Sequence, residues 1–163
     1  MEQTNYEFYE FLVNVDEKHK DFVINVNDML LKKGCKVKIV SSKTSLFNVK
    51  YTMGKTRRGI FNFTLTKKGL KVSVYASSYE KYPDVLNNLH EDVVKQIAES
   101  PICKNMTGPK KCSWADCIGY DIRIGGEHYE KCRYSCFKFD VEPETIPSLL
   151  KLLESECKER AIS

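Results

Sequence analysis

The chain has 163 residues, of which 42% are hydrophobic, and a formal net charge of +4 at pH 7. This composition is apolar enough to bury a core, which excludes wholesale disorder, and the length suits a single domain. No apolar run approaches the roughly 20 residues that span a bilayer, and the start, MEQTNYEFYEF, lacks the features of a secretory signal. We therefore expect a cytoplasmic protein without a membrane partner.

The first elements in chain order are helical. Within residues 6–34 the apolar positions recur at helical spacing, at Phe22, Val23, Val26 and Leu30. Asp16 is a typical N-cap residue, so we expect a short helix before it and a longer one after it. Gly34 follows two lysines and predicts the end of the longer helix.

Four segments with alternating polar and apolar residues follow the helices. They cover residues 36–39, 47–53, 61–65 and 70–76. The turn sequences SSKTS, GKTRRG and TKKG separate them, and such short connections predict an antiparallel meander. One face of this sheet would be apolar, whereas the other carries Lys, Thr, Ser and Asn and is expected to be solvated.

The second half of the chain returns to helix at residues 82–100, whose apolar stripe would cover the sheet. Residues 101–119 show no periodicity, which is uncommon in a compact domain unless something orders the segment. A hairpin is predicted over residues 119–141, around Gly125 and Gly126, and a last helix over residues 143–160. The pattern predicts one α+β domain over residues 1–163. Its mostly antiparallel sheet comprises the meander and the C-terminal hairpin, its helices pack on one face, and its cysteine-rich loop and hairpin occupy residues 101–140.

Most of the seven cysteines lie between residues 103 and 136. Zinc takes four Cys or His ligands in a tetrahedron, and a bound ion would order the aperiodic loop. The candidate ligands are Cys103, Cys112, Cys117 and Cys132, with Cys136 and His128 as alternates. Their spacing lacks the close Cys-x-x-Cys pairs of zinc ribbons. The alternatives are reduced packing residues, the reading that we also give to Cys35 and Cys157, or a disulfide or redox role, which a reducing cytosol disfavours.

A nucleophilic cysteine needs a nearby base. His19 and His90 are expected on solvated helix faces, which leaves His128 as the partner for Cys117 or Cys132. The sequence contains no P-loop, Gly-x-Ser-x-Gly or His-Glu-x-x-His pattern. It therefore favours a non-enzymatic protein, and we assign no catalytic residue.

Lysine and arginine recur between Asp28 and Glu80, where no acidic residue occurs. This asymmetry predicts a positive field over the sheet. The candidate ligand-binding residues are Lys55, Arg57 and Arg58 in one turn and Tyr75 on the polar face. They would suit an anionic small molecule or a protein partner, and an exposed aromatic ring among cations also suits nucleic acid. The alternative is an ordinary solvated face whose lysines discourage edge-to-edge aggregation.

The order helix, four-strand meander, helix, hairpin, helix, with GIFNFTLTKKGLKVSVYAS and CRYSCFKFDV, resembles small bacterial domains of the YdhG and GyrI-like effector-binding type. The resemblance implies a compact α+β domain that binds a small molecule or a partner and performs no chemistry. The cysteine-rich residues 101–136 depart from those families, so no functional residue is carried over. The sequence thus predicts a cytoplasmic binding or regulatory module with a structural zinc site. The alternatives are a nucleic-acid-binding domain that uses the basic sheet at residues 32–75 and a cysteine-dependent redox protein.

Overall fold

Helices and antiparallel strands alternate along the chain in the computed structural model, which describes residues 6–54, 58–107, 112–113 and 117–162. The helices are α1 (Phe8–Leu12), α2 (Glu17–Lys32), α3 (Pro83–Asn87), α4 (Glu91–Glu99) and α5 (Ile146–Ile162), with a short 3-10 helix, η1, at Tyr79–Lys81. The strands are β1 (Lys36–Val40), β2 (Phe47–Met53), β3 (Arg58–Thr66), β4 (Gly69–Val74), β5 (Tyr120–Ile124), β6 (Glu127–Lys131) and β7 (Lys138–Asp140). The predicted α+β class is confirmed.

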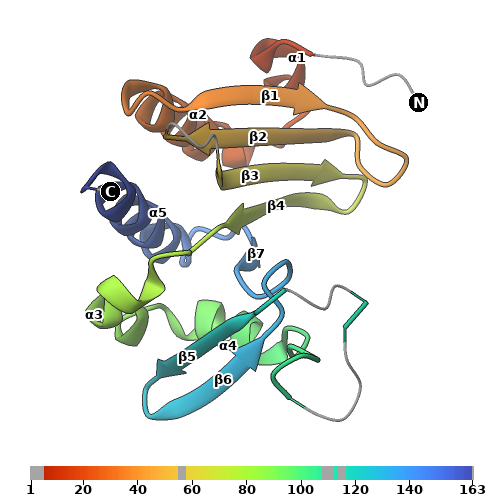
Figure 1. The fold of residues 1–163 in the computed structure, drawn as a ribbon. Helices are drawn as coiled ribbons and strands as arrows, with labels where there is room; N and C mark the ends of the chain where they lie inside the picture. The colour runs from red at the N-terminus through yellow and green to blue at the C-terminus, as the bar shows by residue number, and fades with distance from the viewer. Residues whose placement is uncertain (1–5, 55–57, 108–111, 114–116, 163) are drawn as a thin grey trace.

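Five of these strands form one antiparallel sheet in the order β1-β2-β3-β4-β7, and β5 and β6 form a separate hairpin beside it (Figure 1). The predicted meander is confirmed as β1 to β4. The predicted C-terminal hairpin is shorter than residues 119–141, because its second strand ends at Lys131. The chain then turns, with the amide of Cys136 donating to the carbonyl of Cys132 at 3.0 Å, and β7 pairs with β4. Cys132 and Cys136, which the predicted hairpin would place on one face of its second strand, therefore lie in a turn instead.

Local signals in the sequence set the limits of α2. The carboxylate of Asp16 accepts a hydrogen bond from the amide of Lys18 at 3.2 Å, as its predicted role as N-cap requires. Gly34 has a φ of +83°, a left-handed conformation that ends the helix at little steric cost. The break between α1 and α2 and the end of α2 were thus both predictable.

Two histidines that were expected to be solvated have structural roles instead. The side chain of His19 is buried, and its Nε2 donates to the carbonyl of Val141 at 2.9 Å. His90 is half-buried and is the N-cap of α4, where its Nδ1 accepts from the amide of Asp92 at 3.1 Å. This cap also corrects the prediction of one helix over residues 82–100, because it separates α3 from α4.

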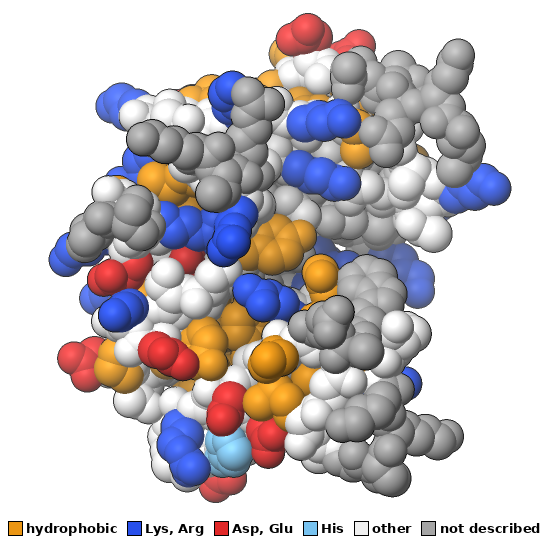
Figure 2. Space-filling model, in the orientation of Figure 1, with side chains coloured by type: hydrophobic (Ala, Val, Ile, Leu, Met, Phe, Trp, Pro, Cys, Tyr) orange, Lys and Arg blue, Asp and Glu red, His pale blue; other side chains and the backbone are white. Residues whose placement is uncertain are grey.

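The main core lies between the five-strand sheet and the helices α1, α2 and α5, which cover one of its faces (Figure 1). Phe63 lies at its centre, with ring centroids 4.8 Å from Phe61, 5.7 Å from Phe11 and 6.0 Å from Tyr51. The hydroxyl of Tyr51 is satisfied because it donates to Asn27 at 2.7 Å. The opposite face of the sheet, called the outer face below, is turned towards the viewer in Figures 1 and 2.

At each edge of the five-strand sheet, one backbone group is hydrogen-bonded to a residue outside the sheet. At the β7 edge, the side chain of Gln96 on α4 accepts from the amide of Asp140 at 2.9 Å. At the β1 edge, the amide of Tyr6 donates to the carbonyl of Ile39 at 3.2 Å. These contacts satisfy backbone groups that edge strands would otherwise leave open.

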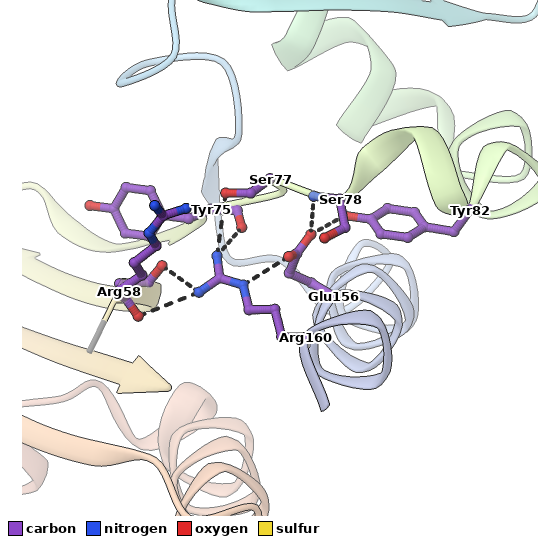
Figure 3. A network of polar contacts seen from close by, with 8 residues as sticks. Arg58, Tyr75, Ser77, Ser78, Tyr82, Glu156 and Arg160 are labelled. Atoms are coloured by element: carbon purple, nitrogen blue, oxygen red, sulfur yellow. Dashed lines mark hydrogen bonds and ion pairs between the residues drawn. The ribbon is translucent and has the colours of Figure 1, made fainter. Parts of the chain in front are cut away.

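A buried carboxylate on α5 is the centre of a polar network (Figure 3). The side chain of Glu156 is fully buried and accepts from the hydroxyl of Tyr82 at 2.7 Å and from the amide of Ser78 at 2.9 Å. Burial, with Glu156 as the next cause, raises the pKa of Tyr82, so this hydroxyl remains a donor. The carboxylate therefore holds η1 and α3 against α5.

Arg160 neutralises this carboxylate and extends the network to the sheet (Figure 3). Its Nε donates to Glu156 at 2.8 Å, and its terminal nitrogens donate to the carbonyls of Gly59 and Tyr75, both at 2.8 Å. These carbonyls lie at the adjacent ends of β3 and β4. One guanidinium thus joins the last turns of α5 to the sheet.

Replacing Glu156 by Gln should destabilise the protein by about 3–5 kcal/mol, because it leaves a largely buried guanidinium without its counter-charge. The measurement is the free energy of unfolding from urea denaturation. Glu154→Gln, an exposed change on the same helix, is the matched control and should stay within about 0.5 kcal/mol of the parent. Equal stabilities for the two variants would contradict the proposed role of the network.

Candidate anion-binding face and cysteine lobe

The outer face carries a row of polar side chains that crosses the whole five-strand sheet. The strand register aligns them, because each residue pairs directly with the next across the neighbouring strand. In strand order the row is Lys38, Lys50, Asn62, Ser73 and Lys138. Lys36 and Lys71 lie two residues along their strands from members of this row, so they share its face.

Positive charge predominates on the outer face. Lys36, Lys38, Lys50 and Lys138 are exposed, and Lys71 is paired with Asp140 at 3.1 Å. Figure 2 shows Lys and Arg side chains over the strands of the sheet, whereas acidic side chains gather towards α1 and towards the hairpin and α3. The lysines of the basic segment that lie on the strands therefore gather on one face of the sheet, the outer face.

The structure places two of the four predicted ligand-binding residues together. Arg160 donates to the carbonyls of Arg58, at 3.4 Å, and of Tyr75, at 2.8 Å. The side chains of Arg58 and Tyr75 lie on the side of this network away from α5 (Figure 3). Lys55 and Arg57 lie outside the described residues.

Tyr75 is held in one orientation over β3. Its ring packs on Gly59, where an added Cβ would lie 3.3 Å from the ring, and its hydroxyl accepts from the Asn62 amide at 2.9 Å. Burial raises the pKa of Tyr75, the hydrogen bond from Asn62 lowers it, and Tyr134 raises it further. Tyr134, exposed between β6 and β7, therefore lies within electrostatic reach of this corner of the outer face.

The cysteine lobe comprises the β5–β6 hairpin, its neighbouring turn at residues 132–136 and the described residues of the segment 101–119. Backbone hydrogen bonds fasten the segment to the hairpin. The amide of Cys103 donates to the backbone carbonyl of Glu130 at 3.0 Å, and the amide of Cys132 donates to the carbonyl of Pro101 at 2.8 Å. Two of the predicted zinc ligands are thus held at the same end of the hairpin.

Asn105 and Gly119 bring the other two predicted ligands to this end. The side chain of Asn105 accepts from the amide of Cys112 at 2.9 Å and donates to the carbonyl of Cys117 at 2.7 Å. At Gly119, an added Cβ would lie 2.1 Å from the Lys131 carbonyl oxygen and 3.0 Å from the Cys103 sulfur. Only glycine permits this approach.

The four predicted zinc ligands are electrostatic neighbours. Burial raises the pKa of the Cys117 thiol, Arg133 lowers it, and Cys103, Cys112 and Cys132 each raise it. All seven cysteines are among the described residues and are free thiols. Across the described ranges, no group of three or more His, Cys, Asp or Glu side chains has an arrangement that could hold a metal ion. The zinc site therefore stays a prediction.

The cysteine–histidine pair that was considered from the sequence is not formed. His128 pairs instead with Asp121 across the hairpin, near the glycine turn and away from the cysteines. The pKa of Cys117 is raised, which favours the neutral thiol, whereas a nucleophile requires the thiolate. These observations weigh against an activated cysteine at Cys117.

Two lysines with clear roles were not singled out from the sequence. Lys131 is buried, and its ammonium donates to the carbonyls of Ala98 at 2.7 Å and Ser100 at 2.8 Å, at the C-terminal end of α4. Lys138 completes the basic row. The alternation of KFDV is the only signal that could have placed Lys138 on a strand, and nothing in it indicates pairing with β4.

The remaining cysteines are packing residues. Cys35 and Cys157 are buried as predicted, and Cys136 is fully buried. Burial raises the pKa of Cys157 to about 11, and it raises that of Cys136 to about 12 against smaller lowering effects of Ser100 and Lys131. Both thiols are therefore neutral at physiological pH.

Comparison with known proteins identifies no relative. No family model, curated protein or solved structure matches the chain. The resemblance to YdhG and GyrI-like domains thus stays a prediction. None of the described helices combines the length and apolarity that crossing a bilayer requires.

Alkaline pH should destabilise the protein through Cys136. Its pKa rises from 9.0 to about 12 on folding, so above pH 9 the unfolded state loses this proton first. Below pH 9 this thiol is protonated in both states and does not lower the free energy of unfolding. Above pH 9 the free energy of unfolding falls by about 1.4 kcal/mol per pH unit, until the thiol of the folded protein also ionises.

Urea denaturation at pH 8 and pH 10.5 of the parent and of Cys136→Ala measures this effect. The loss of stability between the two pH values should be about 2 kcal/mol smaller in the variant. The same loss in both proteins would show that Cys136 does not carry the effect.

Proposed function

We propose that this protein is a non-enzymatic binding module that takes an anionic ligand on the outer face of its five-strand sheet. The observation that carries the proposal is the register, which aligns Lys38, Lys50 and Lys138 in one row. Lysines that alternate along strands are ordinary, but a row across strands concentrates their charge on one surface. Such a surface attracts anions and raises their association rate.

The corner formed by Arg58 and Tyr75 supplies groups that would orient a ligand. A guanidinium can bind a phosphate or carboxylate through two parallel hydrogen bonds. The ring of Tyr75 is already fixed by Gly59 and Asn62, so little conformational entropy is lost when a planar group stacks on it. The lysine row would attract the ligand, and this corner would select it.

A second candidate function is binding of single-stranded nucleic acid on the same face. The row crosses five strands, which at about 4.8 Å per strand spacing gives a length of about 19 Å. That length exceeds a single phosphate group and suits several consecutive nucleotides. Tyr75 and the neighbouring Tyr134 would supply aromatic rings on which bases can stack.

The experiment measures the fluorescence anisotropy of a labelled strand of thymidylates, with pyrophosphate as the competing small anion. Changing Lys38, Lys50 and Lys138 together to Gln should weaken oligonucleotide or pyrophosphate binding at least about tenfold at low salt. For the oligonucleotide, the slope of log affinity against log salt should shrink by about 0.7 per lysine removed.

The matched control changes Lys18, Lys95 and Lys151 to Gln, because these exposed lysines lie on α2, α4 and α5. It has the same net charge and should bind as the parent does. Pyrophosphate binding without oligonucleotide binding would favour the small-anion function. Equal losses in the two triple variants would reject both functions, since net charge alone would then explain the binding.

We further propose that a zinc ion orders the cysteine lobe when it is bound by Cys103, Cys112, Cys117 and Cys132. The supporting observations are that Asn105 binds the backbone of both Cys112 and Cys117, and that backbone hydrogen bonds hold Cys103 and Cys132 at the same end of the hairpin. Thiolates are zinc's preferred ligands in structural sites, and binding would offset the cost of ordering the loop.

Protein purified without a tag or chelator should contain about one zinc per chain by elemental analysis. Cys117→Ser should lose most of this zinc, whereas Cys35→Ser, which changes a thiol in the main core, should retain it per folded chain. A metal-free parent that also fails to bind added zinc would contradict the site. Binding of anions on the outer face can be measured in either case, so the two proposals fail separately.

A further inference from the structure

A groove lies on the helical side of the sheet, between α2 and α5 and beside the end of β2. Its volume is about 810 Å³, within the range typical of small-molecule sites. The lining residues are Met29, Lys33, Met53, Glu154, Cys157, Lys158 and Ala161. It is separate from the outer face, because the sheet lies between them.

The groove exists because α5 presents small side chains where it faces α2. Cys157 and Ala161 are four residues apart and therefore lie on the same side of the helix. Seams between helices in a core are normally filled to close packing by larger side chains. Met29 and Met53, both half-buried, form the rest of the apolar lining, and methionine adapts readily to ligands of different shape.

The charged residues of the groove give it a positive balance. Lys33 and Lys158 oppose one acidic residue, Glu154. The charge of Lys33 reaches the interior of this region, since it lowers the pKa values of both Cys35 and Cys157 against the larger effect of burial. A mainly apolar groove that is also lined by two lysines complements an apolar chain that ends in an anion.

We propose that this groove binds an anionic amphiphile of the fatty-acid class. Its alkyl chain lies against Met29 and Met53, and its carboxylate lies beside Lys33 and Lys158. This site is independent of the function proposed for the outer face, and either can be present without the other.

The four methionines of the chain provide a direct test. In protein labelled with carbon-13 at the methionine methyl groups, Met29 and Met53 report on the groove, and Met106 in the cysteine lobe is an internal control. Dodecanoate below its micelle concentration should shift the Met29 and Met53 signals in a saturable manner and leave Met106 unchanged. Dodecyltrimethylammonium has the same alkyl chain and the opposite charge. It should bind at least about tenfold more weakly, which corresponds to a difference of about 1.4 kcal/mol in binding free energy.

Variants separate the lysines from the apolar lining. Changing Lys33 and Lys158 to Gln should weaken dodecanoate binding about tenfold, whereas changing Lys32 and Lys151, exposed on the same two helices, should not. Ala161→Phe should fill the groove and abolish the shifts without lowering the thermal midpoint. The proposal is overturned by the absence of saturable shifts, by equal shifts at Met106, by equal binding of the cationic amphiphile, or by unchanged binding to Ala161→Phe.

Discussion

A buried carboxylate is costly unless the protein replaces its hydration with hydrogen bonds, and Glu156 is in this position. Its partners are Arg160 on α5 and the residues that flank η1, Ser78 and Tyr82, and Arg160 also binds the carbonyls at the ends of β3 and β4. The ion pair itself lies within α5, but the other partners of Glu156 and Arg160 are remote in sequence, so the whole network forms only once the sheet, the last helix and the middle helices have met. A buried carboxylate that needs this many hydrogen-bond partners favours the one arrangement of the elements that supplies them all and penalises other arrangements.

The same network also holds one corner of the outer face in place. Because Arg160 holds the carbonyls of Arg58 and Tyr75, it fixes the corner that we propose for ligand selection. Tyr134 of the cysteine lobe lies within electrostatic reach of this corner, and the lobe is fastened to α4 by the buried ammonium of Lys131.

Features that depend on neighbouring residues could be predicted from the sequence, and features that depend on distant partners could not. The cap at Asp16, the stop at Gly34 and the four strands of the meander rest on local chemistry or on a periodicity of two. The burial of His19 depends on a carbonyl 122 residues away, at Val141. β7 has only three residues, and its place in the sheet depends on β4. The same holds for the candidate site. The lysines of β1 and β2 could be placed on the polar face from the alternation of polar and apolar residues, whereas the place of Lys138 depends on the pairing of β7 with β4.

The hydrogen bonds at the two sheet edges have a consequence for how the protein would aggregate. A sheet grows by adding strands where backbone amides and carbonyls are unpaired, and here Gln96 and Tyr6 occupy such groups at the two edges. At β7 this contact comes from the side chain of Gln96 on α4, a helix of nine residues. Unwinding of α4 would remove this hydrogen bond and leave the amide of Asp140 open. Polymerisation through strand exchange between copies would then start from an almost native protein rather than from the unfolded chain.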